Sequence, residues 1–199
     1  MNTTRTQQPP LSICVYSSSS DMVDPAYFAT ATALGAAIGG RGDRLVFGGS
    51  NTGLMDAVAR AVKDHGGEVV GVIPEVMRGT PYVFDRADEI VTTKDLRARK
   101  AEMETRADAF VALPGGLGTL DELIEVLAAK QMQFHEKPIV LLNCKDFYEP
   151  LAILFEHLFR EGFASAEHHR PLYHLANDIE EALSYIDAYA PAPFPVKWF

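Results

Sequence analysis

The sequence has few of the residues that mark secreted, disulfide-bonded or membrane-spanning proteins. Its two cysteines, Cys14 and Cys144, lie in apolar, strand-like runs without metal-ligand spacing, so we expect buried free thiols in a reducing compartment. The first ten residues are polar and contain no apolar core of a signal peptide, and no apolar run is long enough to span a membrane. These absences predict a cytoplasmic protein that does not bind membranes.

Positive charge is also scarce, with 18 Lys and Arg against 27 Asp and Glu and a net charge of −9. General affinity for nucleic acid is therefore not expected, and an anionic ligand would need a local cluster of cations. The motifs Gly-x-x-x-x-Gly-Lys-Ser/Thr and Gly-x-Ser-x-Gly are absent, which argues against a P-loop NTPase and a serine hydrolase. Since His168, His169 and His174 lack acidic or cysteine partners at metal-ligand spacing, no metal site is expected.

Apolar strand-like runs alternate with helical patterns along the chain, and its length suits one α/β domain. This alternation predicts a mostly parallel sheet flanked by helices on both faces. We expect a disordered lead-in over residues 1–10, one domain over 11–189 and a proline-rich, aromatic tail over 190–199. The predicted strands are 11–16, 45–47, 68–73, 89–91, 109–113, 138–142 and 172–174. The predicted helices are 25–38, 54–65, 96–107, 119–133, 147–161 and 178–188.

The most informative stretch is 109–122, where an apolar run leads into Pro-Gly-Gly-Leu-Gly-Thr-Leu-Asp-Glu. The apolar run is typical of a strand buried on both faces. Three glycines in four residues, Gly115, Gly116 and Gly118, allow a tight turn and let a ligand approach the backbone amides. The helix that follows offers unpaired N–H groups and a positive dipole end, so the stretch predicts a site for a phosphate or carboxylate.

A purely structural interpretation of the same stretch stays open. Thr119 and Glu122 have the Thr-x-x-Glu spacing of a capping box, in which each side chain satisfies a backbone donor at the helix start. On that interpretation Glu122 serves the helix and not a ligand. The residues alone leave capping and chemistry as equal alternatives.

The predicted helix over 96–107 carries four cations, at Arg97, Arg99, Lys100 and Arg106. One interpretation is a solvated helical face with the surface pairs Lys100–Glu104 and Arg99–Glu102. The other follows from position, because this helix leads directly into the strand and glycine turn of 109–122. A guanidinium that folds back there can bind an anion in a bidentate way, which a lysine cannot.

Two further turns follow strands. Residues 17–20 are four serines, which can bind phosphate through hydroxyls and amides, although a plain loop is the favoured interpretation. Residues 48–53 form a second glycine-rich turn between a strand and a helix. That turn does not have the Gly-x-Gly-x-x-Gly form of a dinucleotide fingerprint.

Three segments with their spacing resemble one family. Residues 48–55 (Gly-Gly-Ser-Asn-Thr-Gly-Leu-Met) resemble its first glycine loop, 99–103 (Arg-Lys-Ala-Glu-Met) its Arg-Lys-x-x-Met segment, and 114–122 its Pro-Gly-Gly-x-Gly-Thr-x-x-Glu signature. Over residues 11–189 the chain is identified as a member of the LOG ("Lonely guy") family of cytokinin riboside 5′-monophosphate phosphoribohydrolases, often labelled lysine decarboxylases.

This resemblance implies a Rossmann-like fold, a homodimer, and hydrolysis of the N-glycosidic bond of adenine-type nucleoside 5′-monophosphates to free base and ribose 5-phosphate. It implies no cofactor and no metal. It makes Arg99 and Glu122 the catalytic pair. The substrate contacts that it implies are Gly49, Ser50, Asn51, Lys100, Met103, Gly115, Gly116, Leu117, Gly118, Thr119, Leu120 and Asp121.

Three rival functions remain beside this one. An AMP nucleosidase would cleave the same bond without preferring a prenylated base. A nucleotide or molybdenum-cofactor carrier on the same fold would bind without cleaving, although a carrier has no need of both Arg99 and Glu122. A lysine decarboxylase would need a lysine that forms a Schiff base with pyridoxal phosphate, and the surroundings of Lys100 and Lys130 do not resemble such a site.

Overall fold

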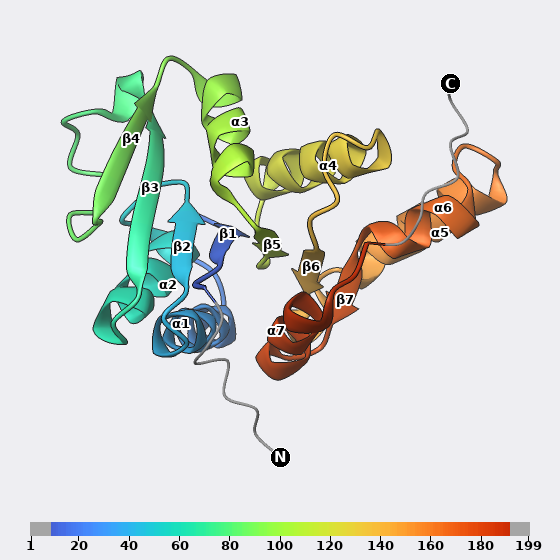
Figure 1. Cartoon of the computed structure of the whole chain (residues 1–199), viewed down its shortest axis with the longest axis horizontal. Coiled ribbons are helices and arrows are strands. Elements are labelled where there is room, and N and C mark those ends of the chain that lie inside the picture. Colours follow the sequence, from blue (N-terminus) through green and yellow to red (C-terminus); the bar gives the residue numbers. More distant parts are fainter. Residues whose placement is uncertain (1–8, 192–199) are drawn as a thin grey trace.

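The computed structural model describes residues 9–191 and places seven parallel strands in one sheet, in the order β4-β3-β2-β1-β5-β6-β7 (Figure 1). Most of the strands are short and almost wholly apolar, as expected for a parallel sheet covered on both faces. The strands are β1 (Ser12–Tyr16), β2 (Arg44–Phe47), β3 (Glu68–Pro74), β4 (Glu89–Thr93), β5 (Ala109–Ala112), β6 (Ile139–Leu142) and β7 (His174–Ala176).

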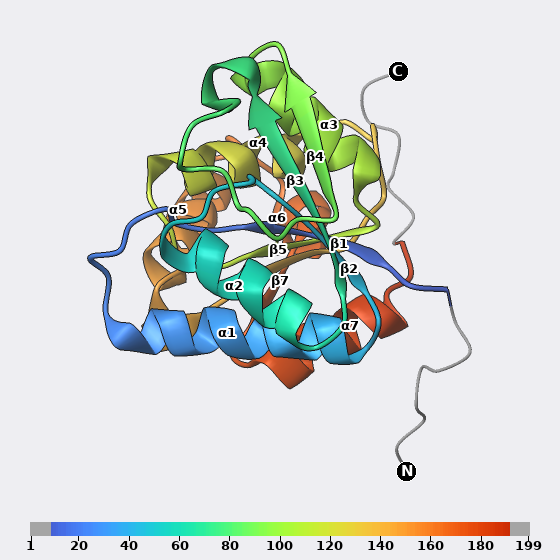
Figure 2. The same ribbon diagram turned by 90° about the vertical axis from the view of Figure 1, so that its left-hand side faces the viewer.

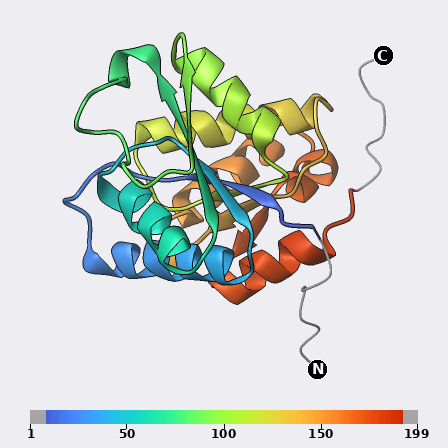
Figure 3. The same ribbon diagram turned by 60° about the vertical axis from the view of Figure 1, so that its left-hand side comes forward.

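Helices cover both faces of this sheet, which confirms the predicted α/β, Rossmann-like architecture. Figures 2 and 3 show α3 and α4 on one side of the strands and α1, α2 and α7 on the other. The helices are α1 (Pro25–Gly40), α2 (Gly53–Asp64), α3 (Leu96–Arg106), α4 (Leu117–Gln131), α5 (Glu149–Arg160), α6 (Ala166–His169) and α7 (Ile179–Ala188). Short 3₁₀ turns are η1 (Glu75–Met77), η2 (Cys144–Asp146) and η3 (Arg170–Leu172).

Two apolar cores follow from the alternation of side chains along each strand. On β1, Ile13 and Val15 belong to the core under α1, α2 and α7. Cys14 and Tyr16 belong to the core under α3 and α4. The helices α3 and α4 therefore cover the face of the sheet on which Tyr16 lies.

The strand order places a ligand-binding position at the centre of the sheet. The chain runs outward from β1 through β2 and β3 to β4, and then returns to β5 on the other side of β1. In open α/β sheets, ligands bind at the carboxyl ends of the strands where the order reverses in this way. Residues that follow β1 and β5, namely the serines 17–20 and the glycine turn 113–116, meet at this point.

Gly53, the first residue of α2, holds the serine loop in place. Its φ is +61°, and a Cβ there would lie 2.5 Å from the carbonyl carbon of Ser19 and 2.7 Å from the carbonyl oxygen of Ser18. The same approach lets the Leu54 amide donate to the Ser18 carbonyl at 2.9 Å, and the Gly53 amide to Asp21 Oδ1 at 2.8 Å. The serine loop is thus fixed on the start of α2.

Some of the predicted boundaries are wrong. The predicted strand over 172–174 begins too early. Leu172 is the last residue of η3, and its carbonyl accepts from Lys130 Nζ at 2.9 Å, whereas β7 begins at His174, which pairs with Val140. Cys144 lies in η2 rather than in a strand, and it is half-buried.

The predicted lead-in over 1–10 and tail over 190–199 lie largely outside the described residues. Among residues 9–191, no helix combines the length and apolar character needed to cross a bilayer.

Replacing Gly53 by alanine is expected to lower the free energy of unfolding by about 2 kcal/mol or more, because a Cβ meets backbone atoms at a left-handed φ. Urea denaturation measures this loss. Gly40→Ala is the matched control, since a Cβ at Gly40 has nothing within 4 Å, and its stability should be unchanged or higher. Equal stability of the two variants would contradict the packing described here.

Candidate functional site

A cavity of about 400 Å³ opens at the point where the strand order reverses. Its walls come from four places in the sequence: the serines 17–20 after β1, Met55 of α2, one side of α3, and the start of α4. From α3 come Leu96, Arg99 and Lys100, and from the start of α4 come residues 116–119, 121 and 122. The cation-rich segment within 96–107 and the glycine-rich segment within 109–122 therefore line the same cavity.

Arg99 and Glu122 form a buried ion pair in this cavity, with 2.9 Å between Arg99 Nη1 and Glu122 Oε1. The side chains are 12% and 7% exposed. Arg99 is also held from β3, because its Nε donates to the Val72 carbonyl at 3.0 Å. The guanidinium thus links the end of β3 to α4 and fixes the carboxylate of Glu122.

Gly48 leaves the space that this guanidinium occupies. A Cβ at Gly48 would lie only 2.0 Å from Arg99 Nη2. The glycine loop after β2 therefore contributes to the site through a missing side chain, which sequence reasoning did not identify.

Burial raises the pKa of Glu122 above its ordinary value of 4.5, and Arg99 opposes this shift through its charge and its hydrogen bond. Desolvation disfavours the ionised carboxylate, whereas the adjacent guanidinium favours it. The carboxylate of Glu122 is thus held by Arg99 at the wall of the cavity.

The capping-box interpretation of Thr119 and Glu122 is wrong. α4 begins at Leu117 with Gly116 as its N-cap, and no side chain caps it. Gly116 adopts an extended backbone, with φ −86° and ψ −158°, and this starts the helix two residues before Thr119. Thr119 is therefore already inside the helix, and the carboxylate of Glu122 is used by Arg99 instead of by the backbone.

The first turn of α4 has backbone amides without a partner in the helix. The first backbone amide with a helical partner is that of Leu120, which donates to the Gly116 carbonyl at 3.0 Å. The amides before it have no acceptor within the helix. Gly116, Leu117 and Gly118 are exposed and line the cavity, so these N–H groups and the helix dipole are available to an anionic ligand.

Lys100 does not form the predicted surface pair with Glu104. Its Nζ contacts Asp121 Oδ2 at 2.8 Å and also pairs with Glu125, so it joins α3 to α4. Burial lowers the pKa of Lys100, but the two ion pairs outweigh burial and raise the pKa above 10.5.

The predicted surface pair between Arg99 and Glu102 is wrong as well, because Glu102 pairs with Arg106 instead. Both surface pairs were expected from helical spacing alone. Partners on α4 and β3 replace them.

The structure brings the predicted catalytic pair and only part of the predicted substrate-binding residues to the cavity. Arg99, Lys100, Gly116, Leu117, Gly118, Thr119, Asp121 and Glu122 line it. Gly49, Ser50, Asn51, Met103, Gly115 and Leu120 are not among its lining residues, and their role in binding stays a prediction.

Packing and local hydrogen bonds explain where these residues lie. Asn51 Nδ2 donates to the Pro81 carbonyl at 2.7 Å, and Ser50 bridges to Val83. Met103 is fully buried in the core under α3.

Sequence reasoning missed several residues of the cavity wall. The serines 17–20 were interpreted as a plain loop, yet all four line the cavity, as do Met55 and Leu96. Their position directly after β1 was the available signal, because β1 borders the point where the strand order reverses. Among residues 9–191, no three His, Cys, Asp or Glu side chains are arranged to hold a metal ion.

Comparisons with known proteins agree with the sequence motifs. Residues 55–186 match the family model described as possible lysine decarboxylase. A rice relative named probable cytokinin riboside 5′-monophosphate phosphoribohydrolase LOGL9 is 38% identical over 179 residues, which cover 90% of this chain and 78% of the relative. The Arabidopsis thaliana cytokinin riboside 5′-monophosphate phosphoribohydrolase LOG3 is 37% identical, over 90% of this chain and 83% of the relative.

Solved structures with the same fold include proteins of another kind. The molybdenum cofactor binding protein of Rippkaea orientalis is similar with a TM-score of 0.69 and 25% identity, over 90% of this chain and 97% of that chain. The Chlamydomonas reinhardtii Moco carrier protein is similar with a TM-score of 0.67 and 27% identity, over 90% and 96%. Because the family model covers residues 55–186, and the two relatives named above are 38% and 37% identical over 90% of this chain, this chain belongs to the LOG family.

Proposed function

We propose that this chain is a hydrolase that cleaves the N-glycosidic bond of adenine-type nucleoside 5′-monophosphates, releasing free base and ribose 5-phosphate. The observation that carries the proposal is the buried Arg99–Glu122 pair beside the open first turn of α4 in one cavity. The names of the relatives in rice and Arabidopsis thaliana describe the same reaction class and support it.

The arrangement suits a nucleotide that binds by its phosphate at the start of α4. The exposed amides of Gly116, Leu117 and Gly118 supply donors for a dianionic group without a dense cluster of cations. Glu122 lies one and a half turns along the same helix, roughly 7.5 Å from its start. A phosphate on these amides therefore directs the sugar toward Glu122.

The chemistry requires a carboxylate at that place. Cleavage of the bond between sugar and base builds positive charge on the sugar ring. Glu122 stabilises this charge or activates the attacking water. Arg99 favours the ionised form of this carboxylate and fixes its orientation, and its guanidinium lines the same cavity, where it can assist the departing base.

A carrier function is the second candidate, because the Rippkaea orientalis and Chlamydomonas reinhardtii proteins of the same fold are described as molybdenum cofactor binding and carrier proteins. Binding alone does not need a buried carboxylate in the cavity. The Arg99–Glu122 pair therefore favours hydrolysis over carriage.

Pyridoxal phosphate, which the description possible lysine decarboxylase implies, does not fit the residues present. A Schiff-base lysine needs a neutral amine, usually obtained by a lowered pKa. Lys100, the lysine of the cavity, is held by Asp121 and Glu125, and its pKa is raised. Burial lowers the pKa of Lys130 to about 8, but Lys130 is not among the residues that line the cavity.

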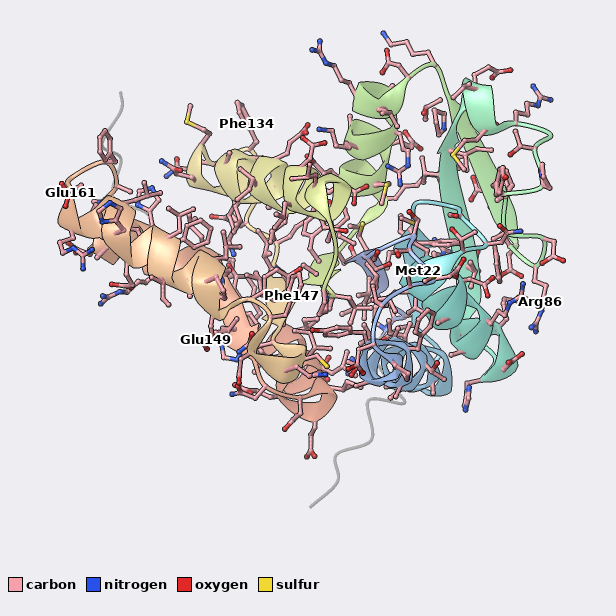
Figure 4. The ribbon with its side chains drawn as sticks, turned by 180° about the vertical axis from the view of Figure 1, so that it is seen from behind. Met22, Arg86, Phe134, Phe147, Glu149 and Glu161 are labelled. Carbon is pink, nitrogen blue, oxygen red and sulfur yellow. The ribbon has the colours of Figure 1, made fainter. Side chains whose placement is uncertain are left out.

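Two further properties are part of the proposal. A homodimer is supported by apolar side chains exposed on and after α4, among them Ile124, Met132 and Phe134. Figure 4 shows Phe134 pointing outward from the end of α4. Light scattering that gives the mass of a single chain would contradict the dimer.

Free thiols at Cys14 and Cys144 support a reducing, cytoplasmic environment.

The reaction itself is tested by incubating the purified protein with AMP and with isopentenyladenosine monophosphate, and quantifying products by chromatography. Base and ribose 5-phosphate should appear in equal amounts. The ratio of the two rates separates a cytokinin-activating enzyme from an AMP nucleosidase. Tight binding of both nucleotides without release of base would support the carrier function instead.

Glu122→Gln should lower kcat by about 10³-fold while the circular dichroism spectrum stays native, because the neutral amide cannot stabilise positive charge on the sugar or accept a proton. Glu180→Gln is the matched control, since Glu180 is exposed on α7, and it should keep the activity of the unmodified chain. Equal activity of both variants would assign Glu122 a purely structural role.

A further inference from the structure

The hydroxyl of Ser17 is buried without a hydrogen-bond partner. Within residues 9–191, three buried side-chain atoms lack a partner: Ser17 Oγ, Arg44 Nε and Asp56 Oδ1. Of these residues, Ser17 lines the cavity. Ser17 is only 2% exposed, so its hydroxyl is shielded from solvent and has no hydrogen-bond partner in the protein. Such groups are rare because they carry a desolvation penalty, and each calls for an explanation.

Several other polar side chains that line the cavity are engaged by the protein. Arg99 pairs with Glu122, and Lys100 with Asp121. In the serine loop, Ser18 Oγ accepts from the Ser20 amide at 3.0 Å. Ser17 Oγ is therefore a buried atom of the cavity wall at which a ligand can add a missing partner.

The backbone around Ser17 is fixed on both sides. The Tyr16 carbonyl accepts from the Leu113 amide at 2.9 Å, which ties the end of β1 to the chain after β5. The Ser18 carbonyl accepts from Leu54 and Met55 at the start of α2. Rotation about χ1 is the freedom left to Ser17, and its staggered positions let the hydroxyl turn toward a ligand without moving the loop.

We propose that Ser17 Oγ binds a sugar hydroxyl of the nucleotide, and that it is a substrate-binding residue of this site. The inference rests on the proposed function for the identity of the ligand. Ser17 shares the buried part of the cavity with Glu122, which is 6% exposed, whereas the amides proposed for the phosphate lie at the exposed start of α4. A carboxylate at this depth repels a phosphate and accepts hydrogen bonds from hydroxyl groups.

The test uses calorimetry on the full chain and its Ser17→Ala variant, with ribose 5-phosphate and inorganic phosphate as probes. Ser17→Ala should weaken the binding of ribose 5-phosphate about tenfold and leave the affinity for inorganic phosphate unchanged. The melting temperature should not fall, because the substitution removes an unsatisfied group. Ser184→Ala, at an exposed position on α7, is the matched control and should bind both probes like the unmodified chain.

Three results would overturn the inference: unchanged affinity for ribose 5-phosphate, an equal loss for both probes, or a lower melting temperature of Ser17→Ala. The equal loss would place Ser17 against the phosphate, and the lower melting temperature would give it a structural role. Neither probe is turned over, so the result is independent of catalysis. Failure of the unmodified chain to release base from AMP would refute the proposed hydrolase. The calorimetric comparison would still test whether Ser17 binds the sugar.

Discussion

The site depends on one interaction, the buried ion pair between Arg99 of α3 and Glu122 of α4. Removal of one partner from a buried pair typically costs about 3–5 kcal/mol, because the other charge is left uncompensated. The surrounding residues are arranged to keep the pair in one geometry. Val72 accepts from Arg99 Nε, Gly48 leaves room for the guanidinium, and Lys100 ties α3 to α4 through Asp121.

This pair also bears on why Glu122 does not cap the start of α4. A glutamate that capped the helix would satisfy backbone donors and remove them from the cavity. Since Glu122 is used by Arg99, and Gly116 supplies no side chain, the first turn of α4 keeps its amides free for an anion. The proposed phosphate site and the proposed catalytic carboxylate therefore both depend on Glu122 pairing with Arg99 instead of capping α4.

The solved structures of similar fold show why the fold alone does not determine the function. The Rippkaea orientalis and Chlamydomonas reinhardtii proteins share the architecture at about a quarter identity, yet they are described as molybdenum cofactor binding or carrier proteins. Activity depends on side chains placed on a fold. For this chain, the proposed hydrolase function rests on the placement of Arg99 and Glu122 in one cavity.

Much of the fold could be predicted from sequence because its signals are local. Apolar runs such as Ala109–Ala112 and the glycines after them mark buried strands and turns without reference to distant residues. The features that sequence did not reveal depend on contacts across the fold. The pairing of Lys100 with α4, the end of the turn at Leu172, and the space at Gly48 are each determined by a neighbour more than 20 residues away.

The start of α4 was mistaken for a different reason. The Thr-x-x-Glu spacing is a local signal, and it indicated a cap at Thr119. The backbone of Gly116 and the guanidinium of Arg99 overrode it. At Glu122, an ion pair with a distant residue therefore replaces the local capping interaction that the spacing predicts.

The central claim, that Arg99 opposes burial and favours the ionised form of Glu122, is tested most directly by titrating the ¹³C-labelled glutamate carboxyl groups by NMR. The Glu122 signal is assigned by its loss in Glu122→Gln. The account predicts a pKa above 4.5 in the unmodified chain and a still higher pKa in Arg99→Met. An equal or lower pKa of Glu122 in Arg99→Met would contradict it.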